Sequence, residues 1–143
     1  MSRGSANILI VDDDMQLANA LAAMLEAEGG YESRLVHCAS DALAAAAEFV
    51  PVIVFLDIEL PDMSGYEVAR ILRRHAQLQA TRLIALTDSI DHPRREDARA
   101  AGFERYLVKP VTVIELHKVL RRRISIGSGP AAMYASAPTT PTL

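Results

Sequence analysis

The strongest constraint on the fold of this chain is an apolar run that ends in a single carboxylate. Residues 52–56 read VIVFL, and Asp57 follows at once. A run that is apolar at every position, and rich in β-branched and aromatic side chains, is typical of a strand covered on both faces by helices. An aspartate is costly inside such a sandwich, so we expect Asp57 at the carboxyl end of the strand, where open α/β sheets form their binding crevice. Asp57 is the first candidate for a reactive group.

Four further short segments have the character of strands and alternate with helical patterns. They lie at residues 8–11, 31–36, 83–86 and 106–108. The second of them is less apolar and is expected near a sheet edge; the other three are followed by Asp12, Thr87 and Lys109. Strands that alternate with helices in this way predict an α/β fold, with a parallel five-stranded sheet, right-handed crossovers and helices on both faces.

Capping residues mark the helices of this pattern. Ser40 is expected to cap an alanine-rich helix, and Thr112 with Glu115 forms a capping box for the last helix. In the helix that begins at Ser64 or Gly65, three arginines are expected to face outward: Arg70, Arg73 and Arg74. In the last helix, the residues expected to face inward are Val113, Leu116, Leu120 and Ile124.

Composition excludes several classes of protein. The chain has 143 residues, half of them apolar, and a formal net charge of −3, which gives no general attraction to nucleic acid or anionic membranes. Its single cysteine, Cys38, excludes an internal disulfide and is expected to be a buried thiol in a reducing compartment. The sequence shows no secretory signal and no membrane span, so we expect a cytoplasmic protein.

Polar residues at the strand ends define a candidate site. Because all carboxyl ends of a parallel sheet lie along one edge, five side chains are expected to converge there: Asp12, Asp13, Asp57, Thr87 and Lys109. Carboxylates this close repel by about 4 kcal/mol per pair, so the site needs a cation, and oxygen-only ligands indicate Mg²⁺. With a lysine and a hydroxyl donor, the site resembles a cradle for a phosphoryl group, with Asp57 as the in-line nucleophile.

These residues resemble the receiver domain of two-component response regulators, the CheY-like domains. The resemblance rests on Asp12-Asp13, Leu56-Asp57 with Pro61 and Gly65, Thr87, Tyr106 and Lys109-Pro110. It implies a flavodoxin-like (βα)5 doubly wound sheet in the strand order 2-1-3-4-5. We expect an N-terminal extension at residues 1–6, the receiver domain at 7–126, and a flexible tail or truncated linker at 127–143.

The resemblance also implies the roles of the site residues. Mg²⁺, or Mn²⁺, is expected on Asp13, Asp57 and the backbone carbonyl of Glu59, with Asp12 acting through a bound water. Asp57 is expected to accept a phosphoryl group from a phosphohistidine on a sensor histidine kinase or phosphotransfer protein, and water later removes it. Thr87 and Lys109 are expected to contact the phosphoryl oxygens.

A conformational switch is implied as well. Movement of Thr87 toward the phosphoryl group lets Tyr106 rotate, which remodels the face formed by the fourth helix, the fifth strand and the fifth helix. Downstream proteins are expected to read that face, and the Lys109-Pro110 bond is expected to be cis, as Pro110 allows.

The sequence departs from the family pattern after Thr87. The next residue is usually small, whereas Asp88 adds bulk and a negative charge beside the phosphoryl site. We expect slow phosphorylation by small donors, with a kinase supplying a compensating positive charge. Glu59 and Ser89 occupy positions that tune hydrolysis in the family.

The expected function is therefore a signalling switch and not an enzyme, apart from its own phosphotransfer and dephosphorylation. Output is expected through protein contacts, without nucleic acid or membrane, from a monomer or weak homodimer. The alternatives are a receiver excised from a hybrid histidine kinase or longer regulator, a binding-only degenerate receiver, and a Mg²⁺-dependent haloacid-dehalogenase-type phosphatase. The last would use Asp12 and Asp14, but Met15 and Gln16 do not fit its motif and Asp57 would be unexplained.

Overall fold

The sheet is parallel throughout. A computed structural model of the chain describes residues 5–88 and 95–121. Within them, the strands are β1 (Ala6–Val11), β2 (Tyr31–Val36), β3 (Ile53–Asp57), β4 (Arg82–Thr87) and β5 (Phe103–Val108). They form one sheet in the order β2-β1-β3-β4-β5. The predicted flavodoxin-like order is confirmed, and β3 lies at the centre of the sheet with Asp57 as its last residue.

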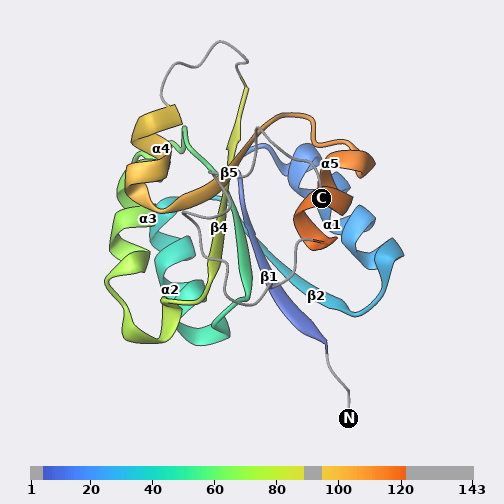
Figure 1. Cartoon of the computed structure of the whole chain (residues 1–143), viewed down its shortest axis with the longest axis horizontal. Helices are drawn as coiled ribbons and strands as arrows, with labels where there is room; N and C mark the ends of the chain where they lie inside the picture. The colour runs from blue at the N-terminus through green and yellow to red at the C-terminus, as the bar shows by residue number, and fades with distance from the viewer. Residues whose placement is uncertain (1–4, 89–94, 122–143) are drawn as a thin grey trace, which may run out of the picture. The chain divides into compact units, whose positions relative to one another are not determined.

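Helices occupy the segments between the strands. They are α1 (Met15–Glu28), α2 (Ala39–Phe49), α3 (Gly65–Arg73), the 3-10 turn η1 (Ala76–Leu78), α4 (Arg95–Ala101) and α5 (Val113–Arg121). The chain divides into two compact units between Val111 and Thr112, and α5 belongs to the second. In the first unit, α2, α3 and α4 lie on one face of the sheet and α1 on the other (Figure 1). No helix within the described ranges is long and apolar enough to cross a membrane.

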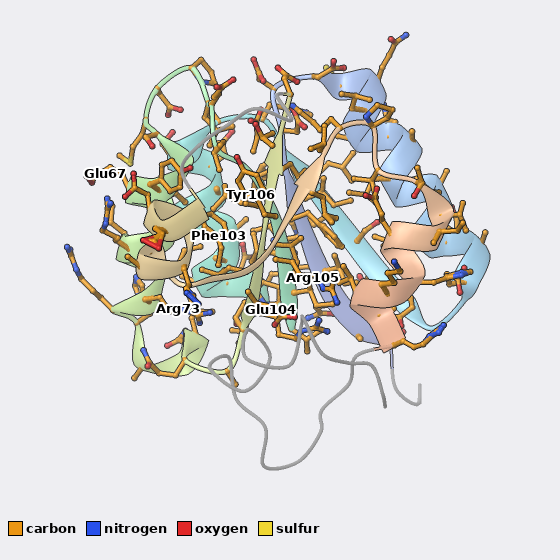
Figure 2. All side chains as sticks on the ribbon, turned by 45° about the horizontal axis from the view of Figure 1, so that its top comes forward. Glu67, Arg73, Phe103, Glu104, Arg105 and Tyr106 are labelled. Carbon is orange, nitrogen blue, oxygen red and sulfur yellow. The ribbon has the colours of Figure 1, made fainter. Side chains whose placement is uncertain are left out.

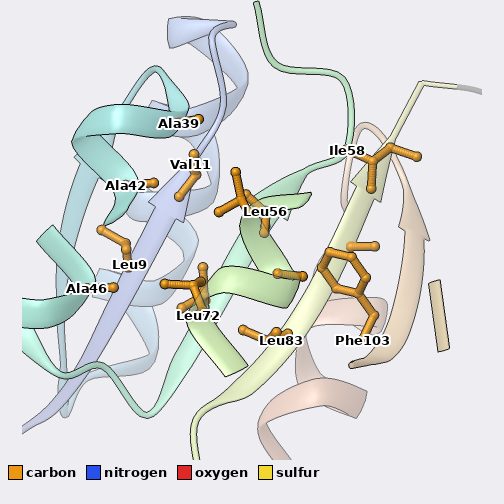
Figure 3. Close-up of a cluster of buried hydrophobic side chains, with 14 of the residues drawn as sticks. Leu9, Val11, Ala39, Ala42, Ala46, Leu56, Ile58, Leu72, Leu83 and Phe103 are labelled. Carbon is orange, nitrogen blue, oxygen red and sulfur yellow. The ribbon is translucent and has the colours of Figure 1, made fainter. Parts of the chain in front are cut away.

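The core under α2, α3 and α4 is built from strand side chains and small helix residues. All five residues of β3 are buried, whereas Val52, which was expected to belong to this strand, precedes it and is 47% exposed. Figure 3 shows leucines of the sheet and α3 packed against the alanines of α2. The helix face toward the sheet consists of Ala39, Ala42, Ala45 and Ala46. Side chains this small let α2 approach the sheet closely, so larger residues there would be overpacked.

The start of α2 contradicts the expected cap. The helix begins at Ala39, and its N-cap residue, Cys38, makes no capping hydrogen bond through its side chain. Instead, the carboxylate of Asp62 accepts hydrogen bonds from the backbone N–H groups of Ala39 at 2.8 Å and Ser40 at 3.2 Å. Ser40 cannot cap because it lies inside the first turn. Cys38 is half-buried and not fully buried as expected.

The second unit confirms one prediction and corrects another. The backbone N–H of Thr112 donates to Glu115 Oε1 at 3.2 Å, and the N–H of Glu115 donates to Thr112 Oγ1 at 3.1 Å, so the capping box is present. Val113 is 48% exposed and does not face inward, because it lies in the first turn, outside the buried stripe of Leu116 and Val119. Ile124 and the tail at 127–143 lie outside the described residues.

Arg73 is a further correction in the first unit, because its side chain turns inward. Its guanidinium donates to the backbone carbonyls of Leu78 at 3.1 Å, Gln79 at 3.3 Å and Gly102 at 3.2 Å. Burial lowers the pKa of Arg73, and the nearby carboxylate of Glu104 opposes this shift (Figure 2). Gly102 has a φ of +107°, and a Cβ there would lie 2.9 Å from Arg73 Nε. Arg73 therefore ties α3 to the connection between α4 and β5.

We expect Arg73→Ala to lower the free energy of unfolding by about 2–3 kcal/mol, because three carbonyls lose a charged donor and two chain segments lose their link. The matched control is Arg70→Ala on the same helix, where an exposed arginine pairs with Glu67 at 3.5 Å. That change should be below about 0.5 kcal/mol. Urea denaturation followed by circular dichroism measures both, and equal losses for the two variants would contradict the structural role of Arg73.

Candidate functional site

Three carboxylates meet at the carboxyl edge of the sheet. Asp12 follows β1, Asp13 comes next, and Asp57 ends β3, the strand that pairs with β1. One carboxylate oxygen from each of the three residues lies within 4.8 Å of the others. Asp12 is 1% exposed and Asp57 is 3% exposed, while Asp13 lies at the surface. The strand pairing therefore brings together residues that are far apart in the sequence, as the sequence predicts.

Backbone groups hold these carboxylates in place. The N–H of Asp14 donates to Asp12 Oδ1 at 2.9 Å, and the N–H of Glu59 donates to Asp57 Oδ1 at 2.8 Å. Asp14 itself caps α1 by accepting a hydrogen bond from the N–H of Leu17. His37 Nδ1 lies 3.1 Å from the backbone carbonyl oxygen of Asp12, which links β1 to the start of α2.

Lys109 supplies the positive charge of the site. Its Nζ lies 3.1 Å from Asp12 Oδ2, 3.3 Å from Asp57 Oδ2 and 3.6 Å from Asp88 Oδ1. Only 7% of the Lys109 side chain is exposed, compared with 69% of the Asp88 side chain. Burial alone would lower the pKa of Lys109, but the surrounding carboxylates, Asp57 first, raise it. The Lys109-Pro110 peptide bond is cis, as expected.

Several opposing effects set the pKa of Asp57. Burial raises its pKa from 3.8 to about 7; the hydrogen bond from Glu59 opposes the rise, the charge of Asp12 adds to it, and Lys109 opposes it. One ammonium group thus faces more negative charge than it can neutralise. Clustered carboxylate oxygens without nitrogen or sulfur ligands suit a hard divalent ion. The residues present fit Mg²⁺ on chemical grounds.

The remaining candidates lie on β4 and β5 or just beyond them. Thr87 is fully buried at the end of β4, and its backbone carbonyl accepts a hydrogen bond from the N–H of Lys109 at 2.8 Å. Tyr106 is half-buried on β5, pairs in register with Ala85 of β4, and packs against the hydrophobic core. The strand pairing therefore places Thr87 beside Lys109. Ser89 lies outside the described residues.

The loop after Asp57, residues 58–65, is closed at its base. The N–H of Gly65 donates to the carbonyl of Ile58 at 2.9 Å, and Glu59 forms a β-bridge with Ser64. Gly65 approaches so closely that a Cβ there would lie 2.5 Å from the carbonyl oxygen of Asp57 and 2.5 Å from Ile58 Cα. Sequence reasoning missed the anchor at the loop tip, Asp62, because its partners are 22 and 23 residues away in the chain.

Residues 8–121 match the family model of the response regulator receiver domain. The match spans most of the chain, and the chain belongs to this family of two-component signalling domains. Receiver domains are signalling switches and not classical enzymes; they take phosphate from histidine kinases and bind Mg²⁺ at an acidic pocket. The family match gives no support to the haloacid-dehalogenase alternative.

Among curated relatives, the chain is 36% identical over 117 residues to the DNA-binding response regulator MtrA of Mycolicibacterium smegmatis, covering 82% of this chain and 50% of MtrA. The chain spans about half the length of the curated relatives it matches. Since MtrA is DNA-binding, it does not support the expectation that nucleic acid plays no part, which stays a prediction.

Solved structures show the same fold. The chemotaxis response regulator CheY4 of Vibrio cholerae matches with a TM-score of 0.76 and 28% identity, over 82% of this chain and 98% of CheY4. The receiver domain of the sensor histidine kinase PA1611 from Pseudomonas aeruginosa matches with a TM-score of 0.75 and 30% identity, over 83% and 97%. That domain holds a magnesium ion in its active site cleft.

Proposed function

We propose that the chain is a phosphorylatable switch whose phosphoacceptor is Asp57. A carboxylate oxygen of Asp57 attacks the phosphorus of a phosphohistidine on a sensor histidine kinase or phosphotransfer protein. The phosphorus–nitrogen bond breaks, a phosphorus–oxygen bond forms, and the imidazole leaves with its electron pair and takes up a proton. The observation that carries this proposal is the buried Asp57 carboxylate, 3.3 Å from Lys109 Nζ and clustered with Asp12 and Asp13.

Asp12, Asp13 and Asp57 are the residues that would hold Mg²⁺ or Mn²⁺, together with the backbone carbonyl of Glu59. When bound, the ion supplies positive charge against the carboxylates and the incoming phosphoryl oxygens. Asp13 is exposed, so the site is accessible from solvent on that side. Water later hydrolyses the acyl phosphate, which resets the switch.

Lys109 and Thr87 are assigned to the phosphoryl group, and Tyr106 to the response. Lys109 would pair with one phosphoryl oxygen, and the Thr87 hydroxyl would donate to another. Movement of Thr87 would open space for Tyr106, whose half-buried ring packs against the core from β5. Support for these roles is the position of Thr87 beside the Lys109 backbone.

Asp88, Glu59 and Ser89 are assigned to the tuning of phosphorylation and hydrolysis. Asp88 is an exposed carboxylate 3.6 Å from Lys109 Nζ, so it competes with an incoming phosphoryl group for the same ammonium group. This competition would slow small phosphodonors. A kinase that brings a positive charge to Asp88 would relieve it.

The receiver domain is assigned to residues 7–126, with an extension at 1–6 and a tail or linker at 127–143. We propose output by protein contact from a cytoplasmic receiver, read partly at the surface of α4 and β5. The second candidate is the same chemistry within a longer regulator or a hybrid kinase, and the half-length match to MtrA and the likeness to the PA1611 receiver favour it.

The test is the intact mass of the protein after incubation with Mg²⁺ and phosphoramidate. We expect one added phosphoryl group in the parent and none with Asp57→Asn or with EDTA. Asp14→Asn is the matched control, because the side chain of Asp14 caps α1 and its backbone N–H to Asp12 is kept, so it should be phosphorylated like the parent. If the parent gains no mass, Asp88→Ala should gain it; continued failure, or phosphorylation of Asp57→Asn, would contradict the proposed function.

A further inference from the structure

Asp62 connects two segments that flank the acidic site. It lies at the tip of the loop of residues 58–65, and its carboxylate accepts the N–H groups of Ala39 at 2.8 Å and Ser40 at 3.2 Å. These hydrogen bonds lower the pKa of Asp62, the bond from Ala39 most strongly. A carboxylate at a helix N-terminus is favoured by the free N–H groups and the helix dipole. The contact is therefore charge-assisted, although Asp62 lies at the surface.

The Asp62 contact is one link in a ring of contacts that includes Asp12 and Asp57. From the Asp12 backbone carbonyl, the ring passes to His37 Nδ1 at 3.1 Å and along the chain to Ala39. It then crosses to Asp62, follows the loop back to Glu59, and ends where the Glu59 N–H meets Asp57 Oδ1 at 2.8 Å. Lys109 closes the ring by bridging Asp57 to Asp12. Every link of this ring is a short polar contact or a few covalent bonds.

The other contacts of this loop are backbone contacts at its base and apolar contacts with the core. Its base is held by the hydrogen bond from Gly65 to Ile58 and by the bridge between Glu59 and Ser64. Leu60 is 8% exposed and anchors the middle of the loop in the core. Met63 also packs against the core, and the Asp62 carboxylate makes the polar contacts described between the loop tip and α2. The bridge to Ser64 and the hydrogen bond to Asp57 hold Glu59 directly, and the Asp62 link adds a restraint from outside the acidic cluster.

We propose that Asp62 is a positioning residue for the metal site: by tying the loop tip to the start of α2, it holds the Glu59 backbone carbonyl in the orientation that binds the cation. This inference rests on the proposed function, since it assumes a cation at Asp12, Asp13 and Asp57. Residues that orient metal ligands from outside the first coordination sphere typically change metal affinity by about tenfold or more.

The experiment is isothermal titration calorimetry of Mg²⁺ into the metal-free protein. The chain has no tryptophan, so binding is followed by heat and not by tryptophan fluorescence. Asp62→Ala should weaken Mg²⁺ binding by about tenfold. Asp62→Asn keeps an acceptor oxygen and should restore most of the lost affinity. At saturating Mg²⁺, phosphorylation of Asp62→Ala by phosphoramidate should return to the parent rate, because the nucleophile itself is unchanged.

Ser64→Ala is the matched control. The side chain of Ser64 also caps a helix from the same loop, accepting the N–H of Tyr66 at 3.1 Å. This hydrogen bond joins Ser64 to α3, the helix that follows it directly in the chain, and not to α2. Ser64→Ala should bind Mg²⁺ like the parent. Parent-like affinity in both Asp62 variants, or equal losses in Asp62→Ala and Ser64→Ala, would overturn the positioning role while the proposed function stands. Failure of the parent to bind Mg²⁺ would overturn both proposals.

Discussion

Gly65→Ala should reduce the rate of phosphorylation by about a hundredfold, because the added methyl group displaces the backbone that carries Asp57. The new Cβ would lie 2.5 Å from the Asp57 carbonyl oxygen and 2.5 Å from Ile58 Cα. Both contacts are with backbone at the end of the central strand, where no side chain can rotate away. The same displacement should lower the free energy of unfolding by about 1–3 kcal/mol.

Gly30→Ala is the control for this prediction. Gly30 has a φ of +86°, so alanine is strained there, but no atom lies within 4 Å of the added Cβ. It should cost about 1–2 kcal/mol of stability and leave phosphorylation unchanged. Rates come from intact mass against time with phosphoramidate and Mg²⁺, and stabilities from urea denaturation. A Gly65→Ala protein that is phosphorylated at the parent rate would show that the close approach does not position Asp57.

The metal-free protein should lose stability as the pH rises through neutrality. Asp57 has a pKa of about 7 in the folded chain, against 3.8 as its ordinary value. An acid whose pKa is raised by folding keeps its proton longer in the folded chain, so the free energy of unfolding falls between the two values and is level above the higher one. One pKa unit corresponds to about 1.36 kcal/mol, so the fall from pH 5 to pH 7 should be roughly 2–3 kcal/mol.

Asp57→Asn isolates this effect from other titrating groups. In EDTA, the stability advantage of the variant over the parent should grow by roughly 2–3 kcal/mol between pH 5 and pH 8. Asp41→Asn, at an exposed position in the first turn of α2, should follow the parent at both pH values. Adding Mg²⁺ at pH 8 should recover stability in the parent only. A constant difference between parent and Asp57→Asn across this range would contradict the raised pKa.

The sequence predicts the sheet and the convergent site well, because both depend on local signals. Residues 52–56 are apolar at every position, so the central strand and its final carboxylate follow from short-range pattern alone. Parallel pairing then brings Asp12, Asp57 and Lys109 together without any knowledge of loop paths. The capping box at Thr112 and Glu115 is equally local.

The wrong predictions involve partners that are distant in the chain. Ser40 looked like a cap because serine is common there, but Asp62 from another loop supplies the acceptor. Arg73 looked exposed beside Arg70 and Arg74, but carbonyls beyond the end of α3 draw its guanidinium inward. Charge and helical spacing do not encode such contacts, since a hydrogen bond across the fold depends on backbone positions that only the tertiary structure sets.

Lys109 couples the charges at three strand ends electrostatically. Its ammonium group contacts carboxylates at the ends of β1, β3 and β4, namely Asp12, Asp57 and Asp88. When one of these groups gains or loses charge, the attraction left for the other two changes at once. The pKa of Asp57 therefore depends on the charges of Asp12 and Lys109 as well as on its own burial. A change of charge at one strand end therefore alters the electrostatic energy at the other two without any movement of the backbone.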